Sequence, residues 1–266
     1  MEYDSSLGKM IISTPQLTVF FLILARIAGI FIQAPILNSK SIPFMIKSAL
    51  AIWISLVLWF VVPVYQSLPA TLPLFLGTLI FEVAFGFAIG FLCNIIFIGI
   101  QAGGEIIDMQ MGLSVATALD PTFGAVISIV GRLCFWLAIF IFIGADGLHL
   151  LFSSLNQTFS VIPAGKIANF TSPHLVELFI SLGTNMWETA IRLAAPAIIL
   201  IFLSDFTFGI VSRVAPQVNV FMLGFQVKPL LGMFGIMLAL PFILNHITKL
   251  MEFMTVQAAL LINILK

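Results

Sequence analysis

GGEIIDMQMGLSVATALDPTFG, residues 103–124, is the one polar and flexible interruption between two long apolar blocks of this chain. Gly103 and Gly104 weaken a helix through backbone entropy, and the Asp120-Pro121 pair favours a turn. Between these breakers most side chains are small or unbranched, as in Met-Gln-Met at residues 109–111. The sequence therefore predicts a loop over residues 103–124, set between membrane helices.

Two interpretations of this loop are open. An exposed connector between two spanning helices is the commoner case, because most loops lie on the surface. The composition favours the other: Ile107 and Leu113 are too apolar for water, while Glu105 and Asp108 are too charged for lipid. Irregular backbone at membrane depth is tolerated where protein buries it or where it borders a water-filled cavity. This second interpretation implies a pore or partner subunits.

The overall composition is that of an integral membrane protein. Of the 266 residues, 61% are hydrophobic and 8% charged, against about 45–50% and about 25% in soluble domains. The 11 basic and 11 acidic residues leave no net charge to attract nucleic acid. The chain has 27 Phe but only 2 Tyr and 4 Trp, so it lacks the Tyr and Trp belts of lipid-facing helices. We expect much of its apolar surface to pack against other membrane subunits.

Long apolar blocks predict an all-α, polytopic fold with long, broken helices. A bilayer takes about 20 apolar residues per span. The blocks cover residues 15–37, 46–62, 74–101, 125–152, 175–208 and 233–265. The spacing of Gly86 and Gly90 favours close approach of another helix to the third block. Pro216, Gly224 and Pro229 predict a broken elbow over residues 206–232, between the last two long helices.

Charged residues inside the apolar blocks need a partner or water. Arg26 either belongs to a buried ion pair or reaches the interface by extending its side chain, and both interpretations are open. If it is paired, Glu82, inside the third apolar block, is the nearest plausible counter-charge. Glu188 and Arg192 are four apart, which places them on one helical face as a pair. The other charges expected to be buried or to lie at subunit contacts are Asp108, Arg132, Asp205 and Arg213.

No catalytic or ligand-binding signature is present in the sequence. HExxH, P-loop, GxSxG, EF-hand and dinucleotide fingerprints are absent, and the three histidines lie in different segments. Cys93 and Cys134 lie singly in apolar runs, which indicates small buried side chains. We predict no enzyme activity, no cofactor and no metal site. An intramembrane enzyme using Asp108, Asp120 and His149 is less favoured, because such residues are more often structural.

A small-molecule or ion secondary transporter acting alone is the stronger alternative function. The substrate sites of such transporters are formed by broken helices and intramembrane charges. Many of these transporters show internal repeats, whereas the flexible regions GGEIIDMQMG and RVAPQVNVFMLG share little. Saturable uptake of a solute by the chain alone in liposomes would identify a transporter.

Three long stretches carry a resemblance to a known family. They are ARIAGIFIQAPILNSKSIPFMIKSALA at residues 25–51, AGGEIIDMQMGLSVATALDP at 102–121, and FTFGIVSRVAPQVNVFMLGFQVKPLLG at 206–232. On these stretches the chain resembles the FliR family, membrane subunits of the bacterial flagellar export gate with counterparts in virulence type III secretion systems. The resemblance runs nearly end to end and rests on long strings rather than on a short catalytic motif.

The resemblance implies a fold, a set of partners and a location. Residues 1–174 would be FliP-like, and residues 175–266 a FliQ-like helical hairpin with its elbow at 206–232. One such chain would join several FliP and FliQ subunits, with FlhB as a further partner, in a helical hetero-oligomer. This assembly would be the closed pore through which unfolded flagellar proteins pass as transient cargo. It would lie in the bacterial inner membrane, within the flagellar basal body.

The resemblance also implies that the central loop is a plug. The loop that helps close the pore in this family maps onto residues 103–124, which favours the second interpretation of the loop. Flexible Met side chains can repack as a gate opens and closes, so Met109, Gln110 and Met111 are the expected sealing tip. The other expected loop residues are Gly103, Gly104, Gly112, Leu113 and Ser114.

Overall fold

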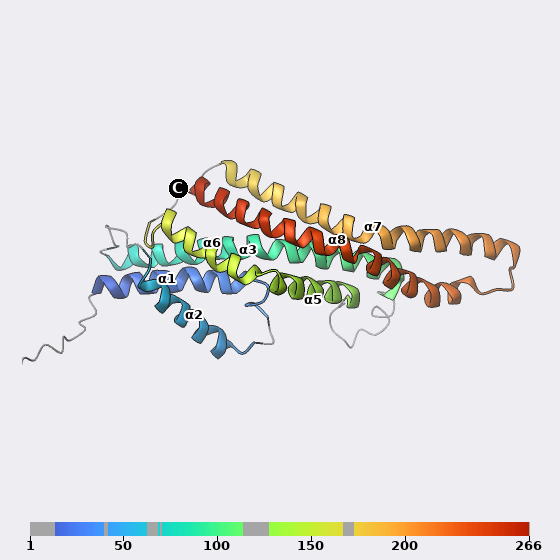
Figure 1. Cartoon of the computed structure of the whole chain (residues 1–266), viewed down its shortest axis with the longest axis horizontal. Helices are drawn as coiled ribbons and strands as arrows, with labels where there is room; N and C mark the ends of the chain where they lie inside the picture. The colour runs from blue at the N-terminus through green and yellow to red at the C-terminus, as the bar shows by residue number, and fades with distance from the viewer. Residues whose placement is uncertain are drawn as a thin grey trace, which may run out of the picture. The chain divides into compact units, whose positions relative to one another are not determined.

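The computed structural model describes residues 14–39, 42–62, 69, 71–113, 128–166 and 173–265. Within these ranges the chain is helical and contains no β-strand, which confirms the all-α prediction. The helices, as labelled in Figure 1, are α1 (Thr14–Gln33), α2 (Phe44–Trp59), α3 (Leu72–Met111), α5 (Ile129–Gly144), α6 (Gly147–Val161), α7 (Pro173–Val214) and α8 (Val220–Leu265).

Helix length and composition confirm a polytopic membrane protein. In the described part of the chain, 4 helices are long and apolar enough to cross a bilayer, or up to 5 if the bent pair α5 and α6 counts as one span. The four candidate spans lie in α1, α3, α7 and the first half of α8. Helix α2, with 16 residues, is shorter than a full span.

Helix α3 contradicts part of the predicted loop. It continues through Gly103 and Gly104 and ends at Met111, so residues 103–111 are helical. The prediction took into account the backbone entropy of the two glycines but not the helices that pack against them. Both glycines lie against other helices, where the missing side chain permits close packing. Tertiary packing therefore outweighs the local preference.

The predicted elbow is also narrower than residues 206–232. Helix α7 runs to Val214 and α8 begins at Val220, so the break is confined to residues 215–219. The Asn219 side chain accepts a hydrogen bond from the Met222 N–H at 3.3 Å, which satisfies one free amide at the start of α8. Pro229 lies inside α8 rather than ending it, as prolines in membrane helices often do.

The apolar block predicted at residues 125–152 is broken in the structure. Helices α5 and α6 meet at an angle of 71°. Asp146, between them, has φ of 57°, a left-handed conformation that Asp tolerates better than most residues. Asp146 therefore separates two helices within a segment that hydropathy alone predicts to be one continuous helix.

The described residues belong to two compact units. The first lies within Met1–Gly90 and Leu155–Asn169 and holds α1, α2, the first part of α3 and the end of α6. Helices α1 and α3 approach closely at Gly86, where a Cβ would overlap the Arg26 carbonyl oxygen. At Gly90, a Cβ would lie 2.8 Å from the Ile30 carbonyl oxygen. The close approach predicted from the spacing of these glycines is confirmed.

The second unit lies within Phe91–Ser154 and Phe170–Leu265 and holds the end of α3, α5, and the α7–α8 hairpin. Helices α7 and α8 run side by side in opposite directions (Figure 1). A Cβ at Gly235 of α8 would lie 2.5 Å from the Cα of Ala197 in α7, so the two backbones nearly touch. Phe97 of α3 packs edge to face on Phe142 of α5, with ring centroids 5.3 Å apart.

Candidate functional site

The last turns of α3 are held between two other helices of the second unit. A Cβ at Gly103 would lie 2.8 Å from the carbonyl oxygen of Ala190 in α7. On another side of α3, a Cβ at Gly104 would lie 2.7 Å from the Cα of Gly131 in α5. These predicted loop residues are therefore points of close contact of α3 with α7 and α5.

The three residues expected to form a sealing tip lie in different environments. Met109 is 70% exposed and Gln110 is also exposed, whereas Met111 is 1% exposed. Met111 lies over Gly232 of α8, where a Cβ would come within 2.7 Å of Met111 Cγ. Met111 therefore anchors α3 to α8, and only Met109 and Gln110 present free surface.

Gly112 follows the last residue of α3 and lies in a turn. Its φ is +80°, in the left-handed region that glycine adopts at little cost. The nearest atom to an added Cβ would be Phe225 Cε1 at 3.6 Å, an ordinary contact distance. The need for glycine here therefore comes from the backbone and not from lack of space. Leu113 is half-buried, and Ser114 lies outside the described residues.

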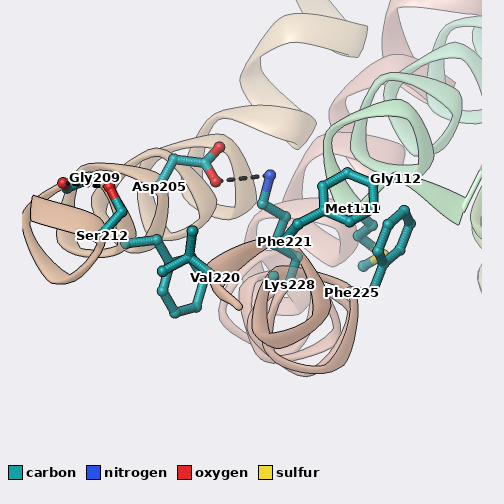
Figure 2. Close-up of a pocket in the computed structure, with 11 residues that line it drawn as sticks. Met111, Gly112, Asp205, Gly209, Ser212, Val220, Phe221, Phe225 and Lys228 are labelled. Carbon is teal, nitrogen blue, oxygen red and sulfur yellow. Dashed lines mark hydrogen bonds and ion pairs between the residues drawn. The ribbon is translucent and has the colours of Figure 1, made fainter. Parts of the chain in front are cut away.

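A cavity of about 410 Å³ lies beside Gly112 (Figure 2). Its walls come from the end of α3, the last turns of α7 and the first turns of α8. Phe221 and Phe225 pack edge to face in one wall, with ring centroids 4.8 Å apart. The lining residues are Met111, Gly112, Asp205, Phe208, Gly209, Ser212, Val220, Phe221, Gly224, Phe225 and Lys228.

One ion pair lies in this mostly apolar cavity. Lys228 Nζ is 2.7 Å from Asp205 Oδ1, with the two side chains 26% and 44% exposed (Figure 2). The sequence analysis expected Asp205 to be buried or at a contact but did not name Lys228. The pairing was detectable in principle, because both residues lie nearly the same distance along the chain from the turn at residues 215–219. A hairpin brings such positions together.

Asp108 is buried in α3, as expected for a charge in this region. The residue is 5% exposed, and its Oδ1 atom has no hydrogen-bond partner among the residues that the structure describes. Ser204 of α7 has a buried hydroxyl without a partner in the described chain as well. A buried polar atom without a partner costs free energy.

Arg26 and Glu82 form the buried ion pair proposed from the sequence. Arg26 Nε donates to Glu82 Oε2 at 2.6 Å, and both side chains are fully buried. Arg26 also donates to the Thr158 hydroxyl at 3.2 Å and to the Ile162 carbonyl at 3.0 Å. The Gly165 N–H donates to Glu82 Oε1 at 2.9 Å. The alternative, an Arg26 side chain that reaches the membrane interface, is excluded by its burial.

Aromatic rings enclose the Arg26 guanidinium. Its Cζ lies 4.7 Å from the Phe85 ring centroid and 4.1 Å from that of Phe159. The negative face of an aromatic ring attracts a cation, most strongly where water is excluded. This cluster therefore ties α1, α3 and α6 together in the first unit through one charge.

The remaining predicted charges lie on the surface of the described chain. Glu188 and Arg192 form the expected pair on α7, with side chains 48% and 60% exposed. Arg132 on α5 and Arg213 on α7 are exposed. No group of three or more His, Cys, Asp or Glu residues suited to a metal occurs among the residues searched, which are those the structure describes.

Comparison with known proteins identifies the family. The model of bacterial export proteins, family 1, matches residues 17–254. The flagellar biosynthetic protein FliR of Escherichia coli (strain K12) is 31% identical over 224 residues, covering 81% of this chain and 82% of that protein. FliR of Bacillus subtilis (strain 168) is 27% identical over 211 residues, covering 79% of this chain and 81% of that protein.

A protein of a secretion system is also similar. The Yop proteins translocation protein T of Yersinia pestis is 27% identical over 263 residues, covering 96% of this chain and 98% of that protein. The matches include the helices that build both compact units. The chain therefore belongs to bacterial export proteins, family 1, and is a membrane component of a flagellar or type III protein-export apparatus.

Proposed function

We propose that this chain joins FliP and FliQ subunits in one hetero-oligomer of the bacterial inner membrane, within the flagellar basal body. The assembly is the closed pore through which unfolded flagellar proteins leave the cell, with FlhB as a further partner. The match of the export-protein family to residues 17–254 carries this proposal. In it, the chain is a structural subunit without catalytic activity of its own.

The exposed apolar surface supports a role inside an assembly. Only 22% of the apolar window of α7 and 28% of that of α8 is buried within the chain. Large side chains such as Phe202, Phe206 and Met237 are more than half exposed. Lipid can cover such side chains, but the scarcity of Tyr and Trp argues for protein neighbours over much of this surface.

The end of α3 is the part of the chain that we propose lies on the export path. Met109 and Gln110 remain the sealing residues of the proposal, because both are exposed on the last turns of the helix. Met111 is withdrawn from that role, since it is buried against Gly232. The segment that follows Gly112, up to residue 124, is the rest of the proposed plug.

Site-specific photo-crosslinking tests this placement. A photoreactive residue is introduced at Met109 or at Met111 in living cells, and an export cargo is arrested by a folded domain fused to its trailing end. We expect Met109 to form adducts with the cargo only when the cargo is arrested. Met111 is the matched control, because its burial restricts it to adducts within its own chain.

Two results would count against the proposal in different ways. Adducts from Met109 only to neighbouring subunits, with export intact, would leave the chain in the gate but reduce the end of α3 to a structural joint. Failure of the chain to copurify with FliP and FliQ from the same cells would overturn the co-assembly. Saturable solute uptake by the chain alone in liposomes would instead favour the transporter alternative.

A further inference from the structure

The α7–α8 hairpin is tightly packed at one level and leaves space at another. At Gly235, a Cβ would lie 2.5 Å from the Cα of Ala197. Nearer the turn of the hairpin, Gly209 of α7 and Gly224 of α8 line the cavity of about 410 Å³. A Cβ at Gly209 would meet no atom of the described chain within 4 Å. The cavity therefore lies where the two helices leave room between them (Figure 2).

Glycine enlarges this cavity from both helices. The lining residues lie at positions 205, 208, 209 and 212 of α7 and at 220, 221, 224, 225 and 228 of α8, so each helix presents one face to it. Gly209 and Gly224 lie within these faces, although glycine costs helix stability relative to alanine. A water molecule takes about 30 Å³ in the liquid, so the space is large enough for the four heavy atoms of a methionine side chain.

The Met111 side chain lies beside this cavity. Met111 lines its wall, yet the side chain lies over Gly232 and the residue is 1% exposed. Gly232 follows Lys228 by one helical turn, so the contact with Gly232 and the cavity lie along the same face of α8. Methionine is unbranched and has three rotatable side-chain bonds. Rotation about these bonds therefore takes the Met111 side chain from one place to the other.

The cavity offers favourable contacts to a methionine side chain. Phe208, Phe221 and Phe225 contribute aromatic rings to its walls, and a thioether sulfur interacts favourably with such rings. Phe221 and Phe225 are 70% and 39% exposed, so Met111 would be less buried among them than over Gly232. The position over Gly232 is therefore the more populated one, and the cavity is the less populated one.

We infer that Met111 is a two-position anchor. Over Gly232 its side chain holds the end of α3 on α8, and in the cavity, among the phenylalanine rings, it releases that end. The α7–α8 hairpin itself stays intact, because the contact at Gly235 and the ion pair of Asp205 with Lys228 do not involve Met111.

The consequence for the gate rests on the proposed function. Met109 and Gln110 precede Met111 on the last turn of α3, so release of Met111 frees the turn that carries the proposed sealing residues. Gly112, which follows it, has φ of +80° and can adopt other conformations at little cost. The anchor is therefore a conformational device at the base of the proposed plug.

Methyl NMR of the purified full-length chain in detergent tests the two positions. The methionine methyl groups are isotopically labelled, and the Met111 signal is identified by its loss in Met111→Leu. We expect relaxation dispersion to show exchange with a second position populated at about 0.1–10% and shifted by the aromatic rings. Gly232→Ala should raise that population about tenfold or more, since overpacking disfavours the position over residue 232. Gly209→Leu fills the cavity and should abolish the exchange.

Gly77→Leu is the matched control for Gly209→Leu. It makes the same change in the other compact unit, where an added Cβ also meets no atom of the described chain within 4 Å. The Met111 exchange in this control should stay within about twofold of wild type. A wild-type Met111 methyl without exchange would overturn the inference. Exchange that survives Gly209→Leu, or that Gly232→Ala leaves unchanged, would overturn it as well.

Cargo secretion separates this inference from the proposed function. If the end of α3 belongs to the gate, Gly209→Leu should lower secretion about tenfold, because the released position is no longer reached. Secretion by Gly77→Leu should stay within about twofold of wild type. Unchanged secretion by Gly209→Leu, with its Met111 exchange abolished, would support the two-position anchor and remove the end of α3 from the proposed gate.

Discussion

Arg26 and Glu82 are 56 positions apart in the sequence, yet Arg26 Nε lies 2.6 Å from Glu82 Oε2 with both side chains fully buried. Each member has further partners of its own. Arg26 donates to the Ile162 carbonyl, and Glu82 accepts from the Gly165 N–H. The pair therefore sits in surroundings that are suited to a cation on α1 and an anion on α3, and not to the reverse.

Loss of one charge from this pair should destabilise the protein strongly. Arg26→Gln or Glu82→Gln leaves the other charge buried without its counter-ion, at a cost of about 3–5 kcal/mol. The double variant Arg26→Met with Glu82→Leu should cost less than either, since no buried charge remains. A swap of the two charges should not restore stability, because the Ile162 carbonyl would face an anion. Unfolding of the purified protein in detergent measures each difference, and single variants within about 1 kcal/mol of wild type would contradict the argument.

The close approach of α1 and α3 predicts opposite effects at two glycines of α3. At Gly86, an added Cβ meets the Arg26 backbone, so Gly86→Ala should destabilise by about 1–3 kcal/mol through overpacking. At Gly77, nothing lies within 4 Å, so Gly77→Ala should be neutral or stabilise by up to about 1 kcal/mol. Thermal unfolding of the two variants side by side checks both signs. Equal effects at the two positions would show that helix propensity, and not packing against α1, determines the change in stability.

The left-handed backbone of Gly112 predicts a graded response to substitution. Gly112→Val should strain the end of α3 by about 1–2 kcal/mol, because a β-branched residue does not adopt φ of +80° readily. Gly112→Asn is the matched control, since Asn tolerates this conformation. We expect Val to lower cargo secretion or raise ion leakage and Asn to leave both near wild type. Secretion and conductance that are unchanged in the Val variant would remove the link between this turn and gating.

The contact of Met111 with Gly232 predicts energetic coupling between α3 and α8. Gly232→Ala places a methyl group against Met111 and should destabilise by about 1–3 kcal/mol. Shortening the neighbour by Met111→Ala should relieve part of this cost in the double variant. A double-mutant cycle on the purified protein is expected to show an interaction of at least about 0.5 kcal/mol. Purely additive effects would mean that the two side chains do not share the site.

The class of the protein and the Glu188–Arg192 pair could be predicted from the amino-acid sequence, and the Arg26–Glu82 pair could be proposed from it. A chain with 61% hydrophobic and 8% charged residues needs lipid or other membrane subunits around its surface. Because charges are so few inside the apolar blocks, Glu82 could be named as the plausible partner of Arg26, but the structure was needed to exclude a side chain that reaches the interface. Glu188 and Arg192 followed from helical spacing alone. Hydropathy and helical spacing can both be read from a sequence before its fold is known.

The ends of the helices and the burial of individual side chains depend on tertiary contacts. Gly103 and Gly104 read as helix breakers, yet α3 continues through them because Ala190 and Gly131 pack closely against the vacant side-chain positions. Met109 and Met111 are two residues apart and chemically identical, but one is exposed and the other lies over Gly232. Such contacts join residues far apart in the chain, and their energies outweigh local propensities of about 1 kcal/mol, so no local pattern records them.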